Sequence, residues 1–70
     1  MNAEIFEKLN EMNSKLISKL EIINENQDNL SYSLQNEDMA GEEDIRTAIE
    51  DYEEEVRNAL KIIQRMKLFF

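Results

Sequence analysis

The sequence contains no cysteine, no histidine and no proline, and it has a single glycine. Without cysteine the chain has no disulfide framework and no thiolate chemistry, and without histidine it lacks the commonest general base and metal ligand. Acidic residues cluster at Glu42-Glu43-Asp44 and in the segment 50–55, but no Asp-x-Asp-x-Asp-Gly calcium loop is present. We therefore predict that the protein is not an enzyme and uses no metal and no cofactor.

Long apolar runs are also missing. A membrane span needs about 20 consecutive apolar residues, and no segment of the sequence approaches that length. The first residues, MNAEIFEKLNEM, carry acidic side chains from Glu4 onward, unlike a signal or transit peptide. We expect a cytoplasmic protein that does not insert into membranes.

Basic residues are scarce relative to acidic ones. Eight Lys and Arg face sixteen Asp and Glu, which gives a formal net charge of -8 and a pI of about 4.4. A surface of this charge repels nucleic acid and anionic membranes. The expected partner is therefore a protein that offers basic or apolar groups.

The 70 residues form one domain at most, and their periodicity is helical. The first helix is expected over about 3–35, with Asn2 as its N-cap. The turn is expected at about 36–41, around Gly41, and the second helix over about 42–68. Acidic residues open the second helix and basic residues close it, which matches the helix dipole. The apolar stripe of the first helix comprises Ile5, Leu9, Met12, Leu16, Leu20, Ile23, Leu30 and Leu34.

The second helix carries an apolar stripe with alternating steps of four and three residues, which is typical of a seam against another helix. The stripe comprises Ile45, Ile49, Tyr52, Val56, Ala59, Ile63, Met66 and Phe70. Because the joining segment is short, the predicted fold class is all-α, an antiparallel two-helix hairpin resembling a coiled coil. In the expected register, Leu34 faces Ile45, Leu30 faces Ile49, Ile23 faces Val56, Leu16 faces Ile63 and Leu9 faces Phe70. Ile45, Ile49, Val56 and Ile63 are assigned to the hairpin core.

Towards its end the second helix has more apolar surface than one seam uses. The candidate partner-binding residues there are Leu60, Ile62, Ile63, Met66, Phe69 and Phe70. Burial of a single seam barely offsets the entropy of ordering two helices. The hairpin is therefore expected to dock on a partner, or to self-associate as a homodimer or tetramer.

The segment Gly41–Met66, with the run Ala59-Leu60-Lys61-Ile62-Ile63-Gln64-Arg65-Met66, resembles the second helix of the small E-type needle-subunit co-chaperones of bacterial type III secretion systems, the YscE, PscE and EscE family. The resemblance implies a bacterial cytoplasmic protein that pairs with a tetratricopeptide-repeat co-chaperone. Together the two would keep the needle subunit monomeric and soluble before export. It also implies that Leu60, Ile62, Ile63, Met66 and Phe69 meet the repeat protein. The alternative is a self-assembling structural coiled coil, such as a phage or filament component.

Overall fold

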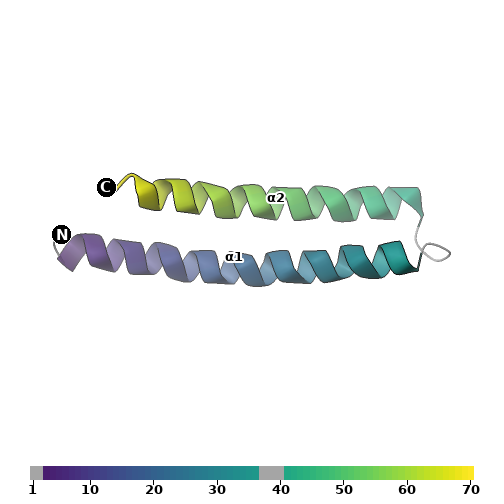
Figure 1. Ribbon diagram of the computed structural model, residues 1–70, viewed down its shortest axis with the longest axis horizontal. Helices are drawn as coiled ribbons and strands as arrows, with labels where there is room; N and C mark the ends of the chain where they lie inside the picture. Colours follow the sequence, from purple (N-terminus) through teal and green to yellow (C-terminus); the bar gives the residue numbers. More distant parts are fainter. Residues whose placement is uncertain (1–2, 37–40) are drawn as a thin grey trace.

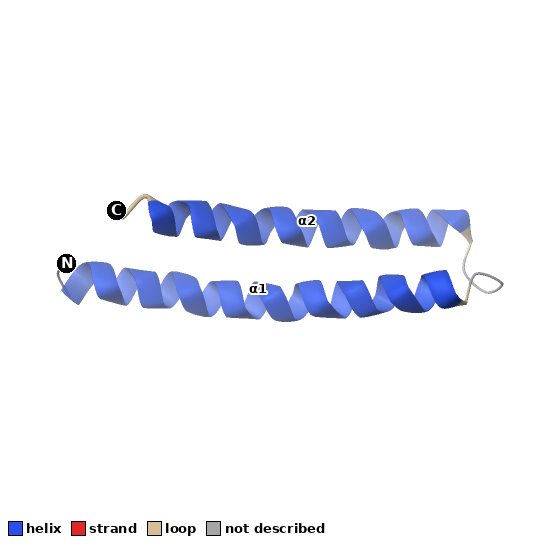
Figure 2. Ribbon diagram, viewed as in Figure 1, coloured by secondary structure: helices blue, strands red, loops and turns tan. Residues whose placement is uncertain are grey.

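The computed structural model describes residues 3–36 and 41–70 as two antiparallel α-helices lying side by side (Figure 1). Helix α1 spans Ala3–Gln35 and helix α2 spans Glu42–Lys67. The described residues contain no strand (Figure 2). The predicted all-α hairpin is thus confirmed. Asn2, the expected N-cap, and most of the expected turn lie outside the described residues.

The start of α2 is fixed by Gly41 and Asp44. The Gly41 amide donates to Asp44 Oδ2 over 3.3 Å, which is one half of a capping box. Glycine has no side chain to supply the other half, so the first amides of α2 rely on the acidic first turn and on solvent. Beyond α2, the amides of Leu68, Phe69 and Phe70 each donate to the carbonyl three residues earlier, so a tight turn continues the helix.

The hairpin is long and only one helix thick. Its Cα atoms extend 56 × 15 × 10 Å with a radius of gyration of 16.2 Å, whereas a compact chain of this length has a radius of about 11 Å. The accessible surface is 5735 Å², and a compact protein of the same mass exposes about 4,600 Å². The two helices therefore leave about 1,100 Å² more surface in water than a compact fold of the same mass.

Burial is shallow along the whole seam. Among the described residues only Ala59, 5% exposed, counts as buried. A small side chain at this point lets the helix axes approach closely. The residues that face the other helix are otherwise half-buried. On α1 they are Ile5, Leu9, Met12, Leu16, Lys19, Ile23, Asn26, Leu30 and Ser33; on α2 they are Ile45, Ala48, Tyr52, Glu55, Ile62 and Met66, followed by Phe69 just beyond its end. Asn58, beside the buried Ala59, is half-buried as well.

The predicted hairpin core is wrong at several positions. Ile49, Val56 and Ile63 are exposed by 50%, 40% and 45%, and on α1 Leu20 and Leu34 are likewise exposed. The residues directly before them in sequence face the opposite helix instead. The physical reason is that the apolar arc of each helix is wider than the strip one neighbour covers, so part of it stays in water.

Two polar contacts across the seam bear on the register. Lys19 Nζ lies 3.2 Å from Glu55 Oε2, and Asn26 Nδ2 donates to the Asp51 carbonyl over 3.5 Å. The predicted register places Asn26 opposite Glu53, two residues or about 3 Å along the axis from Asp51. Leu9 and Leu16 line one groove with Phe70 and Ile63, the partners that the predicted register gives them. Lys19 reaches Glu55 through a long side chain, so this ion pair does not fix the register.

Candidate interaction surface

The hairpin has two long sides that differ in character. An α-helix turns about 100° per residue, and the inward-facing residues alternate three and four positions apart. The residue that follows the second member of each three-residue step therefore lies beside the seam. Because the helices are antiparallel, this rotation directs the side chains at these positions of both helices to the same side of the pair. The residues so placed on α1 are Phe6, Asn13, Leu20, Gln27 and Leu34, and on α2 they are Ile49, Val56, Ile63 and Phe70.

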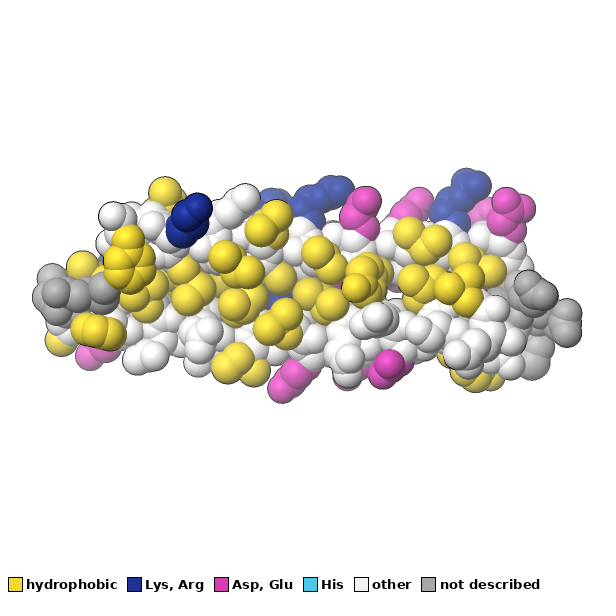
Figure 3. Space-filling model, viewed as in Figure 1, with side chains coloured by type: hydrophobic (Ala, Val, Ile, Leu, Met, Phe, Trp, Pro, Cys, Tyr) yellow, Lys and Arg dark blue, Asp and Glu magenta, His cyan; other side chains and the backbone are white. Residues whose placement is uncertain are grey.

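We call this side the apolar face. It is flanked further round each helix by Ile17 and Leu60, at helical positions that are otherwise polar or charged: Asn10, Asn24, Ser31, Arg46, Glu53 and Lys67. All its apolar members are exposed, from 40% for Val56 to 84% for Phe70. Figure 3 shows hydrophobic atoms running along the line between the helices for most of the length of the molecule, with charged side chains at the rims. The face is therefore one continuous strip built by both helices, rather than isolated exposed side chains.

At the Phe70 end of the strip lies an open apolar groove. Leu9 and Leu16 of α1 line it together with Ile63, Met66, Lys67 and Phe70. Among these residues Lys67 alone carries a charge. The groove shows that residues of α1 and α2 come together on the apolar face, and it is a receptive shape for a large apolar side chain.

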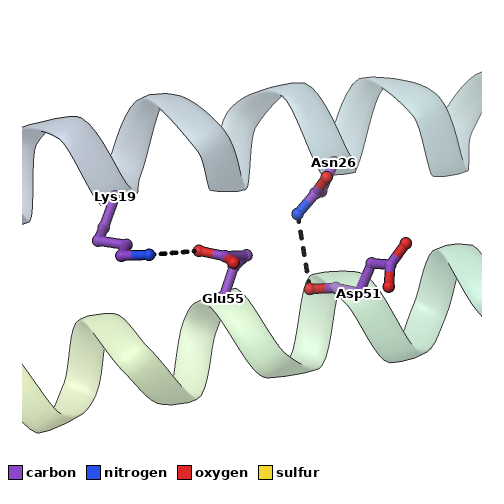
Figure 4. Close-up of polar contacts among 4 residues, drawn as sticks. All are labelled: Lys19, Asn26, Asp51 and Glu55. Atoms are coloured by element: carbon purple, nitrogen blue, oxygen red, sulfur yellow. Dashed lines mark hydrogen bonds and ion pairs between the residues drawn. The ribbon is translucent and has the colours of Figure 1, made fainter.

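The opposite side, which we call the polar side, carries the interhelical polar contacts. Lys19 and Glu55 form an ion pair, and Asn26 reaches the backbone of Asp51 (Figure 4). The side chains of Lys19 and Glu55 are 34% and 22% exposed. This partial burial makes the pair more than a surface contact, although water still reaches both groups. Ile22 is an exposed apolar residue on this side, at 39%.

The structure divides the six predicted partner-binding residues between two environments. Ile63 and Phe70 are exposed on the apolar face, Leu60 is exposed at its flank, and Met66 lines the groove from its half-buried position. Ile62 and Phe69 are half-buried against α1. Sequence reasoning missed the contribution of Leu9, Leu16, Leu20 and Leu34 from α1. Their spacing carried a signal, because Leu20 and Leu34 are fourteen residues, or about four turns, apart on one stripe.

Charge is distributed unevenly along the hairpin. The Gly41 end, residues 20–36 and 41–55, carries eleven acidic residues and one basic residue, Arg46. The Phe70 end, residues 3–19 and 56–70, carries three acidic and seven basic residues. The molecule is therefore a long electric dipole, strongly negative where α2 begins and positive where it ends.

The described residues hold no group of three or more acidic, histidine or cysteine side chains placed to bind a metal ion. Within the same ranges neither helix has the length and apolar content that a bilayer span requires. The feature that distinguishes this site is therefore its apolar face.

Fold and site together define an α-helical hairpin with one unpartnered apolar face. Comparison of the chain with protein-family models, with curated proteins and with solved structures gives no match. What this face binds has therefore to be argued from its geometry and charge.

Proposed function

We propose that this chain is a protein-binding hairpin that acts as a co-chaperone in the bacterial cytoplasm. In this role it pairs with a tetratricopeptide-repeat protein, and the two keep a type III secretion needle subunit monomeric and soluble before export. The observation that supports binding is the continuous apolar face on a chain whose described residues include one buried side chain. The resemblance of the segment Gly41–Met66 supports the particular partner.

The apolar groove at the Phe70 end suits such a complex. Repeat proteins built from helix pairs present concave surfaces that bind helices. A thin hairpin gains stability from any partner that covers its exposed side chains, by mass action on the folded state. Docking would bring Ile63, Met66 and Phe70 into contact with the repeat protein, with basic Lys67 at the rim.

Co-expression tests the proposal. The chain, the repeat protein and the needle subunit are produced together, purified by a tag on the hairpin, and examined by size-exclusion chromatography with light scattering. We expect a stable complex that contains one hairpin and one repeat protein, with the needle subunit retained as a monomer. A needle subunit that polymerises equally well with and without the hairpin would contradict the proposal.

Phe70 and Leu68 offer a matched pair for this experiment. Both side chains are 84% exposed, but only Phe70 lines the groove. Phe70→Asp should weaken the complex at least about tenfold, because a carboxylate would be buried against an apolar surface. Leu68→Asp should leave the affinity within about threefold of the unchanged chain, a difference of under 1 kcal/mol. Equal losses would show that the groove is not the contact.

A second candidate function is a self-assembling structural coiled coil. The observation in its favour is that the apolar face runs along both helices rather than being confined to one end. A filament or a large oligomer of the purified chain, in the absence of any partner, would favour this function over the co-chaperone.

A further inference from the structure

We propose that the apolar face is covered by a second copy of this chain, in a dimer whose twofold axis crosses the hairpin at the level of Leu20 and Val56. The two copies would pack face to face and end to end, forming an antiparallel four-helix bundle. This inference concerns the chain alone, so its test is independent of the test of the co-chaperone proposal.

The available area fits a dimer. Stable interfaces bury about 1,200–2,000 Å² in total. Each hairpin exposes about 1,100 Å² more than a compact protein of its mass. The molecule is 10 Å thick between Cα atoms in its shortest direction, so a second hairpin would supply the missing layer at an ordinary helix packing distance of 8–10 Å. A second copy that covered about 600 Å² of this excess on each hairpin would reach the lower end of that range without any change in the hairpin.

The position of the axis follows from the stripes. Leu20 and Val56 lie at nearly the same level: Asn26 contacts the Asp51 backbone, Leu20 lies six residues before Asn26, and Val56 lies five residues after Asp51 on the antiparallel helix. About Leu20 the stripe of α1 is symmetric in character: Phe6 and Leu34 lie fourteen residues away on either side, and Asn13 and Gln27 lie seven residues away. About Val56 the stripe of α2 places Ile49 and Ile63 at equal distances. A twofold axis here sets Phe6 against Leu34 and Ile49 against Ile63, while Phe70 meets Glu42 fourteen residues from Val56.

Two face-to-face arrangements have twofold symmetry, and the polar residues of the face separate them. With the axis across the hairpin, α1 packs on α1 of the second copy, and Asn13 meets Gln27. The two amides then satisfy one another by hydrogen bonding. With the axis along the hairpin, α1 packs on α2, and Asn13 meets Ile63 while Gln27 meets Ile49. That arrangement buries both amides against hydrocarbon, which is costly.

The charge distribution selects the same arrangement independently. An axis along the hairpin brings the two Gly41 ends together, each with eleven acidic residues and one basic residue. An axis across it places each Gly41 end on the Phe70 end of the other copy, where seven basic residues outnumber three acidic ones. Attraction between opposite charges near the interface favours the end-to-end arrangement.

Disulfide trapping tests the inference, since the chain has no cysteine of its own. Asn13→Cys and Gln27→Cys chains are mixed in equal amounts and oxidised in a thiol redox buffer. The proposed dimer joins position 13 to position 27, so the mixed product should exceed each same-residue product about tenfold. Two copies of position 13 would lie about 21 Å apart along the bundle, beyond the Cα separation of about 7 Å that a disulfide tolerates.

The alternative arrangements predict different products. A dimer with its axis along the hairpin would instead join Asn13→Cys to Ile63→Cys, and that product would overturn the proposed arrangement. The oligomeric state is measured on the unchanged chain by light scattering over a concentration series. We expect a dimer at micromolar to millimolar concentration. A monomer throughout this range, including one that takes up a repeat protein, would overturn the inference, and so would a filament.

Discussion

The two long sides of the hairpin are built from the same two helices but differ in how their side chains are satisfied. On the polar side, Lys19 and Glu55 pair across the seam and Asn26 binds the backbone of Asp51, so the contacts are complete within one chain. On the apolar face, both helices expose hydrocarbon that no residue in the ranges 3–36 and 41–70 covers. The polar side therefore fixes how α1 and α2 meet, and the apolar face is where a further molecule gains most by binding.

The largest expected effect comes from placing a charge on the apolar face. Val56→Asp would put two carboxylates close together at the proposed twofold axis. We expect the dimer dissociation constant to rise at least about 100-fold, because buried like charges are strongly unfavourable. Sedimentation equilibrium over a concentration series measures this change.

Ile22→Asp is the matched control for that substitution. Ile22 is 39% exposed and Val56 is 40% exposed, but Ile22 lies on the polar side. The control should change the dimer dissociation constant by less than about threefold. If Ile22→Asp weakens the dimer as much as Val56→Asp does, the distinction between the two sides fails.

A smaller effect is expected from reversing one charge on the polar side. Lys19→Glu sets two carboxylates against each other across the seam and should destabilise the hairpin by about 1 kcal/mol, since both groups are partly solvated. The double variant Lys19→Glu with Glu55→Lys should recover most of this loss. Thermal unfolding followed by circular dichroism gives both values.

The surface pair Glu53–Arg57 provides the comparison for the ion-pair experiment. Its side chains are 68% and 62% exposed and its atoms are 3.0 Å apart. Reversing its charges should cost under about 0.5 kcal/mol. An equal cost at both pairs would mean that the Lys19–Glu55 contact does not hold the seam.

The smallest effect is expected at Gly41, which belongs to neither side. Its backbone angles, φ -76° and ψ 165°, suit any residue, and an added Cβ would meet no atom within 4 Å. Gly41→Ser should complete the capping box and stiffen the unfolded chain, stabilising α2 by about 0.5–1 kcal/mol. Chemical denaturation at fixed protein concentration measures this change in the free energy of unfolding. A loss of stability would show that Gly41 is needed for a reason other than helix capping.

The helices and their antiparallel pairing could be predicted from the sequence. One glycine, acidic residues at one end of α2 and basic residues at the other, and a four-and-three periodicity are all local signals. The seam could be predicted in part: Ile45, Tyr52, Ala59 and Met66 face α1 as the predicted stripe requires, whereas Ile49, Val56 and Ile63 do not. The stripe through Ile49, Val56 and Ile63 is more apolar than the stripe through Ala48, Glu55 and Ile62, so a pattern on one helix favours the wrong one.

What decides the seam is a contact between helices. Lys19 and Glu55 interrupt the apolar pattern of their own helices and pair with each other only once the helices are aligned. The candidate interaction surface could likewise be predicted only in part from the sequence. Leu60, Ile63 and Phe70 could be selected from the widened end of α2. The sequence predicts that Leu9 and Leu16 face Phe70 and Ile63, but their exposure in an open groove depends on how much of each side chain the neighbouring helix covers.

The shallow burial around Ala59 has a consequence for the lifetime of the protein in a cell. With one buried side chain among the described residues, the isolated hairpin opens at little free-energy cost. Proteases degrade such transiently opened chains in proportion to how often they open. Whatever covers the apolar face closes the backbone to cleavage, so the steady-state abundance of this protein should follow the abundance of the molecule it binds.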